Sequence, residues 1–147
     1  MKLFETLMDF NICSVIVRLV LATVLGGIIG LERGRHGRAA GLRTHILVCV
    51  GSAMTSLIGL FASHVLNNNG DIFRISAQVI SGIGFLGVGM ILVRKRAIVT
   101  GLTTAAGLWA TSTIGIAIGF GFYVGALIST ALCVLAVTLF GFLGSIS

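Results

Sequence analysis

Long apolar segments, separated by short polar or charged connectors, make up most of this sequence. Residues 46–69 and 75–93 are runs of 24 and 19 positions without Asp, Glu, Lys or Arg, and residues 97–147 lack these four over 51 positions. A helix needs about 20 predominantly apolar residues to cross the hydrocarbon core of a bilayer. One crossing fits each of the first two runs, and two fit the third, with a turn near residues 119–123.

Charged residues interrupt the amino-terminal apolar segment. Only 13 residues separate Arg18 from Glu32, which is too few for a crossing. The pattern favours a helix that begins near Phe10 and carries Arg18 at hydrocarbon depth, over one that begins near Arg18 and holds Glu32 in the inner leaflet. Arg18 would then snorkel to the outer interface or pair with a carboxylate there, for which Asp71 is the candidate.

These patterns predict an all-α membrane protein of about five transmembrane helices, in a single domain of residues 1–147. The predicted spans are 10–31, 45–66, 75–93, 99–119 and 123–145. Basic residues gather in two connectors, Arg33, Arg35, Arg38 and Arg43 in the first and Arg94, Lys95 and Arg96 in the second. Because Lys and Arg are enriched in cytoplasmic loops, we expect the amino terminus outside and the carboxyl terminus in the cytoplasm.

Composition supports a membrane location and narrows the choice of partners. Hydrophobic residues make up 56% of the chain and charged residues 10%, whereas soluble proteins carry about 25% charged residues. The net charge of +6 comes mainly from the two connectors, so we expect membrane lipids and no nucleic acid as partners. A role in setting topology is favoured for these connectors, with binding of anionic lipid or nucleotide as the alternative.

Metal, cofactor and enzyme functions find little support in the residues. Cys13, Cys49 and Cys133 lie singly, without the paired spacing of zinc or redox motifs. No Ser, His and Asp constellation suggests catalysis, so a non-enzymatic protein with no catalytic residue, metal or cofactor is predicted. The acids are Glu5, Asp9, Glu32 and Asp71.

Polar residues beside the first connector are candidates for function. The predicted charge cluster consists of Glu32, Arg33, Arg43 and Thr44. It could form the inner mouth of a pore or a partner site, because charges at membrane depth are costly and tend to be functional. The alternative is an ion pair at a helix end that fixes the depth of the helix.

Further candidates lie inside the predicted spans. Besides Arg18, they are Gln78 and Ser81, which could hydrogen-bond between helices or line a pathway. Thr103 and Thr104 could cap the start of a helix or offer oxygens to a cation. His45 and His64, at opposite ends of one span, are interpreted as interfacial.

Glycine is abundant, with 21 residues, and proline is absent. Small residues let helices approach closely in a bilayer, so the stripes of small residues predict helix packing and make a homo-oligomer plausible. The predicted packing glycines are Gly51, Gly59, Gly82, Gly84, Gly87 and Gly89. The glycine-rich run 81–89 lacks the strand and acidic residue of a dinucleotide site, which leaves helix packing or a locally unwound helix.

Four segments resemble one known family. Residues 26–33 read GGIIGLER, residues 40–44 read AGLRT, residues 77–89 read AQVISGIGFLGVG, and residues 101–106 read GLTTAA, with Trp109 beyond. These motifs are similar to those of the MgtC/SapB membrane proteins of bacteria. Many members continue after the fifth span into a soluble cytoplasmic domain with an ACT-like fold, whereas this sequence stops at Ser147.

The resemblance covers residues 19–123 in order and spacing, and it implies a function. It implies a multi-pass protein of the bacterial inner membrane that is linked to magnesium homeostasis and growth at low Mg²⁺, and to virulence in some pathogens. Family members are generally viewed as regulators, and restraint of the ATP synthase by intramembrane contact is one proposed route. The alternative is a small oligomeric channel or transporter for a cation or other solute.

Overall fold

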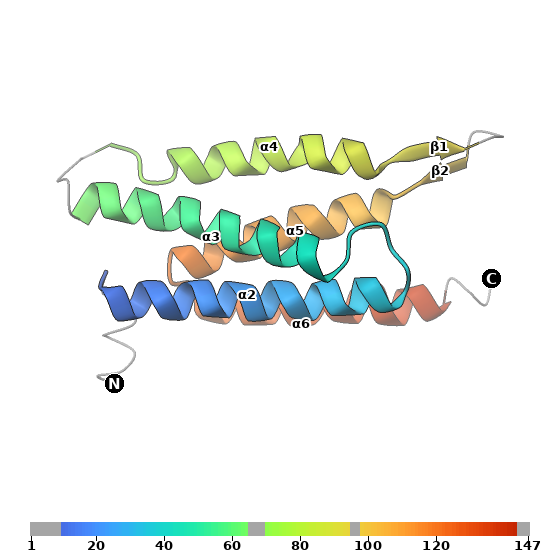
Figure 1. Cartoon of the computed structure of the whole chain (residues 1–147), viewed down its shortest axis with the longest axis horizontal. Coiled ribbons are helices and arrows are strands. Elements are labelled where there is room, and N and C mark those ends of the chain that lie inside the picture. The colour runs from blue at the N-terminus through green and yellow to red at the C-terminus, as the bar shows by residue number, and fades with distance from the viewer. Residues whose placement is uncertain (1–9, 65–69, 95–97, 144–147) are drawn as a thin grey trace.

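The computed structural model describes residues 10–64, 70–94 and 98–143, which form five helices and one short hairpin. The helices are α2 (Ile12–Arg35), α3 (Leu42–His64), α4 (Arg74–Met90), α5 (Leu102–Gly119) and α6 (Tyr123–Leu143) (Figure 1). Within these residues α2, α3 and α5 are long and apolar enough to cross a membrane, while Arg74–Met90 and Tyr123–Leu139 are shorter apolar helices. The prediction of an all-α membrane fold is confirmed.

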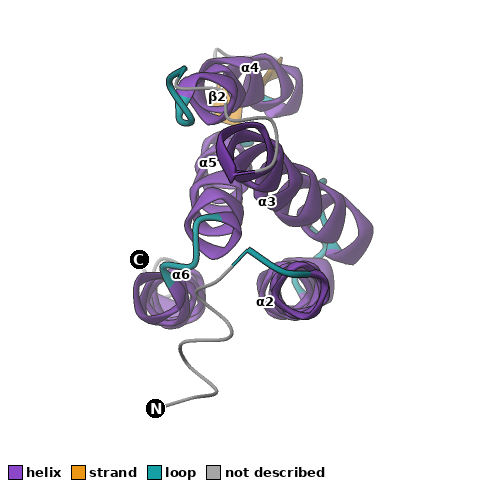
Figure 2. Ribbon diagram, turned by 90° about the vertical axis from the view of Figure 1, so that its left-hand side faces the viewer, coloured by secondary structure: helices purple, strands orange, loops and turns teal. Residues whose placement is uncertain are grey.

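The helices lie in three layers. Helices α3 and α5 form the middle, α4 lies on one side of them, and α2 and α6 lie side by side on the other (Figure 1, Figure 2). The α2–α3 connection and the hairpin lie at the same end of the bundle, which we call the basic end, and the α5–α6 turn lies at the opposite end. Both basic connectors therefore reach one end, as a common side of the membrane requires.

Some sequence predictions stay predictions at this stage. The division into one domain with five membrane crossings, and the placement of the termini, are not tested by the arrangement of helices. Residues 65–66 and 144–145, at the ends of two predicted spans, lie outside the described residues, as do Lys95 and Arg96 of the second basic connector.

Helix α2 starts with a well-defined cap and runs further than expected. Asn11 accepts the backbone N–H of Ser14 at 2.8 Å, and Ser14 Oγ accepts that of Asn11 at 3.3 Å, a reciprocal pair that satisfies two free donors. The helix continues to Arg35, beyond the predicted end of the span at residue 31. Basic side chains in the last turn favour this, because they complement the negative end of the helix dipole.

A hairpin replaces the simple loop expected between the third and fourth spans. Helix α4 ends at Met90, and β1 (Leu92–Arg94) then pairs antiparallel with β2 (Ile98–Thr100). The β-branched residues of this segment favour strands over helix. Gly101 follows with a φ of +95°, where a Cβ would collide with the carbonyl oxygen of Met90, so glycine is required before α5 can begin.

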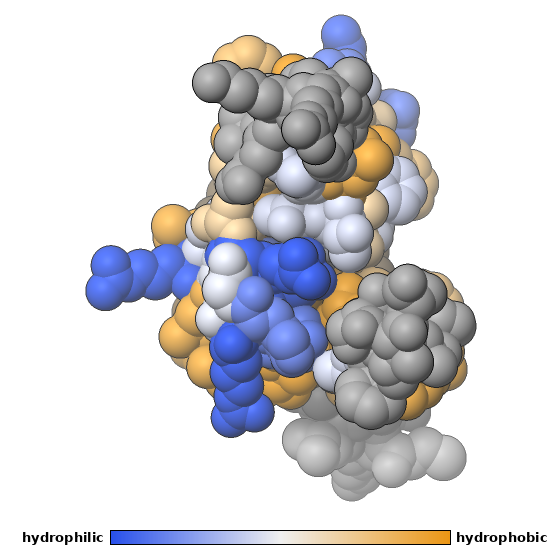
Figure 3. Space-filling model, turned by 90° about the vertical axis from the view of Figure 1, so that its right-hand side faces the viewer, coloured by the Kyte–Doolittle hydropathy of each residue, from blue (hydrophilic) through white to orange (hydrophobic). Residues whose placement is uncertain are grey.

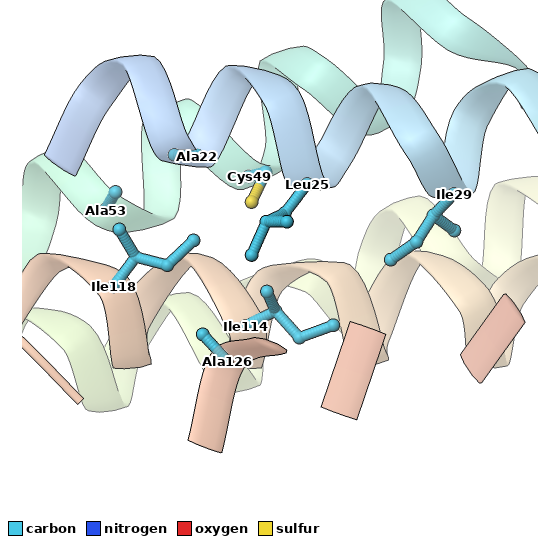
Figure 4. Packing of buried hydrophobic residues seen from close by; sticks show 8 residues of the cluster. All are labelled: Ala22, Leu25, Ile29, Cys49, Ala53, Ile114, Ile118 and Ala126. Carbon is cyan, nitrogen blue, oxygen red and sulfur yellow. The ribbon is translucent and has the colours of Figure 1, made fainter. Parts of the chain in front are cut away.

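The apolar core joins four helices (Figure 4). Its buried members are Ala22, Leu25 and Ile29 of α2, Cys49 and Ala53 of α3, Ile114 and Ile118 of α5, and Ala126 of α6. Lipid tails are as apolar as these side chains, so van der Waals packing has to supply much of the association energy in a bilayer. Close fit between the helices therefore matters more than total apolar area.

Glycines bring α3 close to the helices on both sides. A Cβ at Gly26 would lie 2.7 Å from Cys49 Cβ, and one at Gly30 would lie 2.7 Å from Leu42 Cα. On the other side a Cβ at Gly115 would meet the Cys49 carbonyl and lie 2.9 Å from Ser52 Cβ. Gly119, one turn along from Gly115, is likewise too close to α3 to accept a Cβ. The pairs Gly26–Gly30 and Gly115–Gly119 are thus two glycine stripes with i, i+4 spacing, and they fix the packing of α3.

A pair of buried hydroxyls links α4 to the middle layer. Ser56 Oγ of α3 lies 3.1 Å from Ser76 Oγ of α4 and donates to the carbonyl oxygen of Ile116 in α5 at 3.2 Å. Ser76 is then the donor to Ser56. Three helices are joined by this network, in a region where an unsatisfied hydroxyl would be costly.

Candidate functional site

Arg33 lies in the last two turns of α2 and points into the protein. It is 2% exposed, and its Nη2 donates to Thr104 Oγ1 of α5 at 3.3 Å. Its Nε is buried and has no hydrogen-bond partner among the described residues. A charged donor without a partner at a buried position is costly, so this atom marks a place where a further polar group could bind.

His45 lies in the first turn of α3 and is 0% exposed. Its Nδ1 is 2.9 Å from the carbonyl oxygen of Gly41. Since a carbonyl only accepts, Nδ1 carries a hydrogen, and Nε2 is the acceptor when the ring is neutral. Nε2 is buried without a partner in the described part of the chain, and a Cβ added at Gly107 of α5 would lie 3.7 Å from it.

Glu32 is also largely buried, on the neighbouring face of α2. Its side chain is 10% exposed, and Oε1 lies 3.0 Å from Nδ1 of the more exposed His36. That imidazole nitrogen is also 3.0 Å from the backbone carbonyl of Glu32, which takes the hydrogen bond. Both carboxylate oxygens remain buried without a hydrogen bond within the described residues.

We call Glu32, Arg33, His45 and Thr104 the inner polar cluster. Its members come from α2, α3 and α5 at the basic end of the bundle. It offers an acid, a guanidinium, an imidazole and a hydroxyl, which suits binding of polar groups or ordered water. The described residues contain no group of three His, Cys, Asp or Glu that could hold a metal ion.

The remaining predicted cluster residues lie nearer the surface. Arg43 is exposed and Thr44 is half-buried at the start of α3. Thr103 is exposed, whereas its neighbour Thr104 is buried and accepts from Arg33. Gly101 is the N-cap of α5, and no side chain makes a capping bond there. Of the two threonines, the structure brings only Thr104 to the inner polar cluster.

Arg18 lies at the opposite end of the bundle from this cluster. It is 1% exposed, and it donates from Nε to Tyr123 Oη at 3.0 Å and from Nη1 to the Gly119 carbonyl at 2.8 Å. The predicted pairing with Asp71 is wrong: no ion pair joins the two within the described residues, and the Asp71 carboxylate accepts the backbone N–H of Phe73 in the turn before α4. The C-terminal end of α5 and the first residue of α6 supply these partners instead.

Gln78 and Ser81 are exposed on α4, which is the outermost helix of the bundle. Neither side chain makes a hydrogen bond to another described residue. The glycines Gly51, Gly82, Gly84 and Gly89 likewise have no atom within 4 Å of an added Cβ, whereas Gly59 lies against Ile72 and Gly87 lies 3.5 Å from Ala105 Cβ. A packing role for the four open glycines stays a prediction about contacts between chains.

Sequence reasoning missed the part that His45 plays here. As the first residue of a predicted span, after an Arg-rich connector, it was interpreted as interfacial. The pattern Gly41-x-x-x-His45 was the available signal, because an imidazole can bond to the carbonyl four residues earlier. The sequence does not reveal that Gly30 and Gly107 leave room for this ring between three helices.

Taken together, the apolar helices and the buried charges at their ends define a polytopic helical membrane protein with a polar site at one end. Sequence comparison assigns it further: the profile of the MgtC family matches residues 19–146. The chain belongs to the MgtC family.

Three relatives illustrate the similarity. The putative magnesium transporter YhiD of Escherichia coli K12 is 48% identical over 112 residues, which is 74% of this chain and 52% of the relative. Protein MgtC of Salmonella typhimurium is 43% identical over 121 residues, 82% of this chain and 50% of the relative. Protein SapB of Bacillus subtilis is 37% identical over 114 residues, which is 75% of this chain and 49% of the relative.

The chain spans about half the length of these curated relatives. No solved structure matches it.

Proposed function

We propose that this protein is a non-enzymatic, multi-pass protein of the bacterial inner membrane that takes part in magnesium homeostasis and growth at low Mg²⁺. It acts as a regulator, through contacts between its helices and a membrane partner such as the ATP synthase. Membership of the MgtC family, with relatives named as a putative magnesium transporter and as MgtC, supports the link to magnesium. The family resemblance suggests the partner.

The exposed amide of Gln78 is the observation that most favours intramembrane contact. It lies on the outward side of α4 with Ser81 and with Phe85, which is 83% exposed. An amide that faces lipid without a hydrogen-bond partner costs on the order of several kcal/mol. A helix of another protein that offers a polar side chain would remove this cost.

Complementation tests the proposal. In a strain that lacks the protein, the full chain should restore growth at limiting magnesium and reduce ATP-driven proton pumping in inverted membrane vesicles. The Gln78→Leu variant should be made and inserted normally but should lose both effects, while Ser129→Leu, at an exposed hydroxyl of α6, should keep them. Full activity of Gln78→Leu would contradict contact through this face.

Transport of a cation is the second candidate. The name of the Escherichia coli relative and the buried carboxylate of Glu32 favour it, whereas the lack of a three-ligand group in the described residues does not. Purified protein in liposomes separates the two candidates. A specific Mg²⁺ flux that Glu32→Gln abolishes would favour transport, and no flux from protein that restrains the ATP synthase would favour regulation.

A further inference from the structure

A narrow apolar groove runs between α2 and α6, at the edge of the bundle where these two helices lie side by side (Figure 2). Its volume is about 390 Å³, and it is lined by Leu25 and Ile28 of α2 and by α6 side chains from Leu127 to Thr138. Eleven helical steps along α6 extend it over roughly 17 Å. It is an open groove at the periphery of the bundle.

The lining of this groove suits a hydrocarbon chain. Six side chains line it from α6 and only Leu25 and Ile28 line it from α2, so it is open to the surrounding acyl chains. The lining is almost entirely apolar, with Thr130 and Thr138 both bonded to backbone carbonyls of their own helix. An extended acyl chain fills such a space without leaving polar groups unsatisfied.

Charged residues follow at the basic end of the same helix face. Glu32 and Arg35 come four and seven residues after Ile28, which places them on the side of α2 that lines the groove. The Glu32 carboxylate is nine-tenths buried; Oε1 lies 3.0 Å from His36 Nδ1, whose hydrogen bond goes to the Glu32 carbonyl, and neither carboxylate oxygen has a hydrogen bond within the described residues. Arg35 is exposed. A ligand in the groove would meet a negative group and a positive group side by side.

Further cations surround this end of the molecule. Figure 3 looks onto the basic end and shows hydrophilic side chains in one patch, bordered by hydrophobic surface. The exposed arginines there include Arg38 and Arg43 as well as Arg35. A phosphate at the membrane surface would therefore find several partners, of which Arg35 lies on the face that lines the groove.

We propose that the α2–α6 groove binds one phospholipid with a primary-amine head group, phosphatidylethanolamine. One acyl chain lies in the groove, the phosphate pairs with Arg35, and the ammonium donates to the Glu32 carboxylate. Charge-assisted hydrogen bonds of this kind are roughly twice as strong as neutral ones. Phosphatidylcholine, whose quaternary ammonium has no N–H, cannot make the bond to Glu32. This inference is independent of the proposed regulatory function.

Lipid competition on the purified full-length chain tests the head group. In detergent, native mass spectrometry should find one retained phosphatidylethanolamine, bound on the order of tenfold more tightly than phosphatidylcholine with the same acyl chains. Glu32→Gln should lose this preference and still bind both lipids. Asp71→Asn, the same change in the turn before α4, should keep it. Equal binding of the two lipids to the unaltered protein, or a preference that survives Glu32→Gln, would overturn the proposal.

A second pair of variants tests the groove itself. Ala131→Phe places a ring in the groove and should remove the retained lipid, whereas Leu132→Phe, at an exposed position of α6 outside the groove, should not. Helix content from circular dichroism checks that both variants are folded. Retention of lipid by folded Ala131→Phe contradicts the site. A cross-link formed in cells between Ala131→Cys and a basic residue of a partner helix would also contradict the site, because it would mean that a protein occupies the groove.

Discussion

Arg18 and Arg33 are both buried arginines on α2, but different groups surround them. Arg18 donates to Tyr123 and to the Gly119 carbonyl at one end of the bundle. At the other end Arg33 has one bond to Thr104, and its Nε has no partner within the described residues; the acid Glu32 precedes it in the chain. Guanidinium groups withdrawn from water need such partners, because an unpaired buried charge costs several kcal/mol. The two sites therefore make separate predictions.

Neighbouring threonines allow a matched test at Arg33. Thr104→Val keeps the shape of the side chain and removes the oxygen that accepts from Nη2, so we expect a loss of about 1.5–3 kcal/mol in the free energy of unfolding. Thr103→Val, at the exposed neighbour, should change it by less than about 0.5 kcal/mol. SDS titration of the protein in mixed micelles measures both, and Thr104→Ser should recover most of the loss. If Thr104→Val and Thr103→Val lower the free energy of unfolding by the same amount, the result would argue against the bond between Arg33 and Thr104.

The bonds of Arg18 predict a second effect on stability. Tyr123→Phe keeps the ring, which lies 6.0 Å from the guanidinium carbon, but removes the acceptor for Nε, and should cost about 1–3 kcal/mol. Arg18→Met leaves the Gly119 carbonyl without this donor and should be at least as destabilising. Arg74→Met, at an exposed arginine of α4, is the control. If the control and Arg18→Met unfold at the same SDS fraction, the buried bonds contribute little.

At the scale of elements, α3 is the helix that both glycine stripes approach. A methyl group at Gly115 would meet the backbone of Cys49, while Gly51 on α3 has open space around it. We expect Gly115→Ala to destabilise the fold by about 1–3 kcal/mol through overpacking. Gly51→Ala should be neutral or stabilise it by up to about 1 kcal/mol, because alanine favours helix. The same SDS titration compares the two, and a stable Gly115→Ala would show that α3 and α5 can separate without cost.

The sequence predicted the helices better than their contacts. Runs without charge place α3 to α6 within a few residues, because the length of an apolar run is a local property. The hairpin was missed because residues 92–94 and 98–100 lie on either side of the basic connector, and the pairing of two such short segments does not show in the pattern of charge-free runs. The contact glycines were largely missed for another reason: Gly51 and Gly115 look alike in sequence, and only the neighbouring helix distinguishes them.

Prediction of the site was partial for a related reason. Glu32, Arg33 and Thr104 stood out as polar residues beside or within apolar spans, and they do lie at one end of the bundle. The burial of His45 beside Gly107 was not predicted, because their proximity depends on how α3 and α5 cross. A side chain's depth in the membrane can be estimated from its position in the chain, but the direction it faces depends on packing.

At the scale of the molecule, the common location of both basic connectors predicts one topology. With the basic end in the cytoplasm, a membrane-impermeant thiol reagent added outside should label Phe122→Cys, in the exposed α5–α6 turn, and spare Arg38→Cys. The background should carry alanine at Cys13 and Cys133, which are not fully buried, whereas Cys49 is buried. Labelling of Arg38→Cys in intact spheroplasts would reverse the orientation, and lysed spheroplasts control for reactivity.

The hydroxyl of Ser76 has an effect beyond the contact it makes. Helix α4 buries few residues, so its rotation about its own axis is only weakly fixed by apolar packing. The bond between Ser76 and Ser56 supplies a directional constraint, and it turns Gln78, two residues on, toward the surrounding lipid. A bond inside the bundle thereby determines which groups a neighbouring protein would encounter. Losing it would let α4 turn and change recognition, although no residue on the outer face of α4 is substituted.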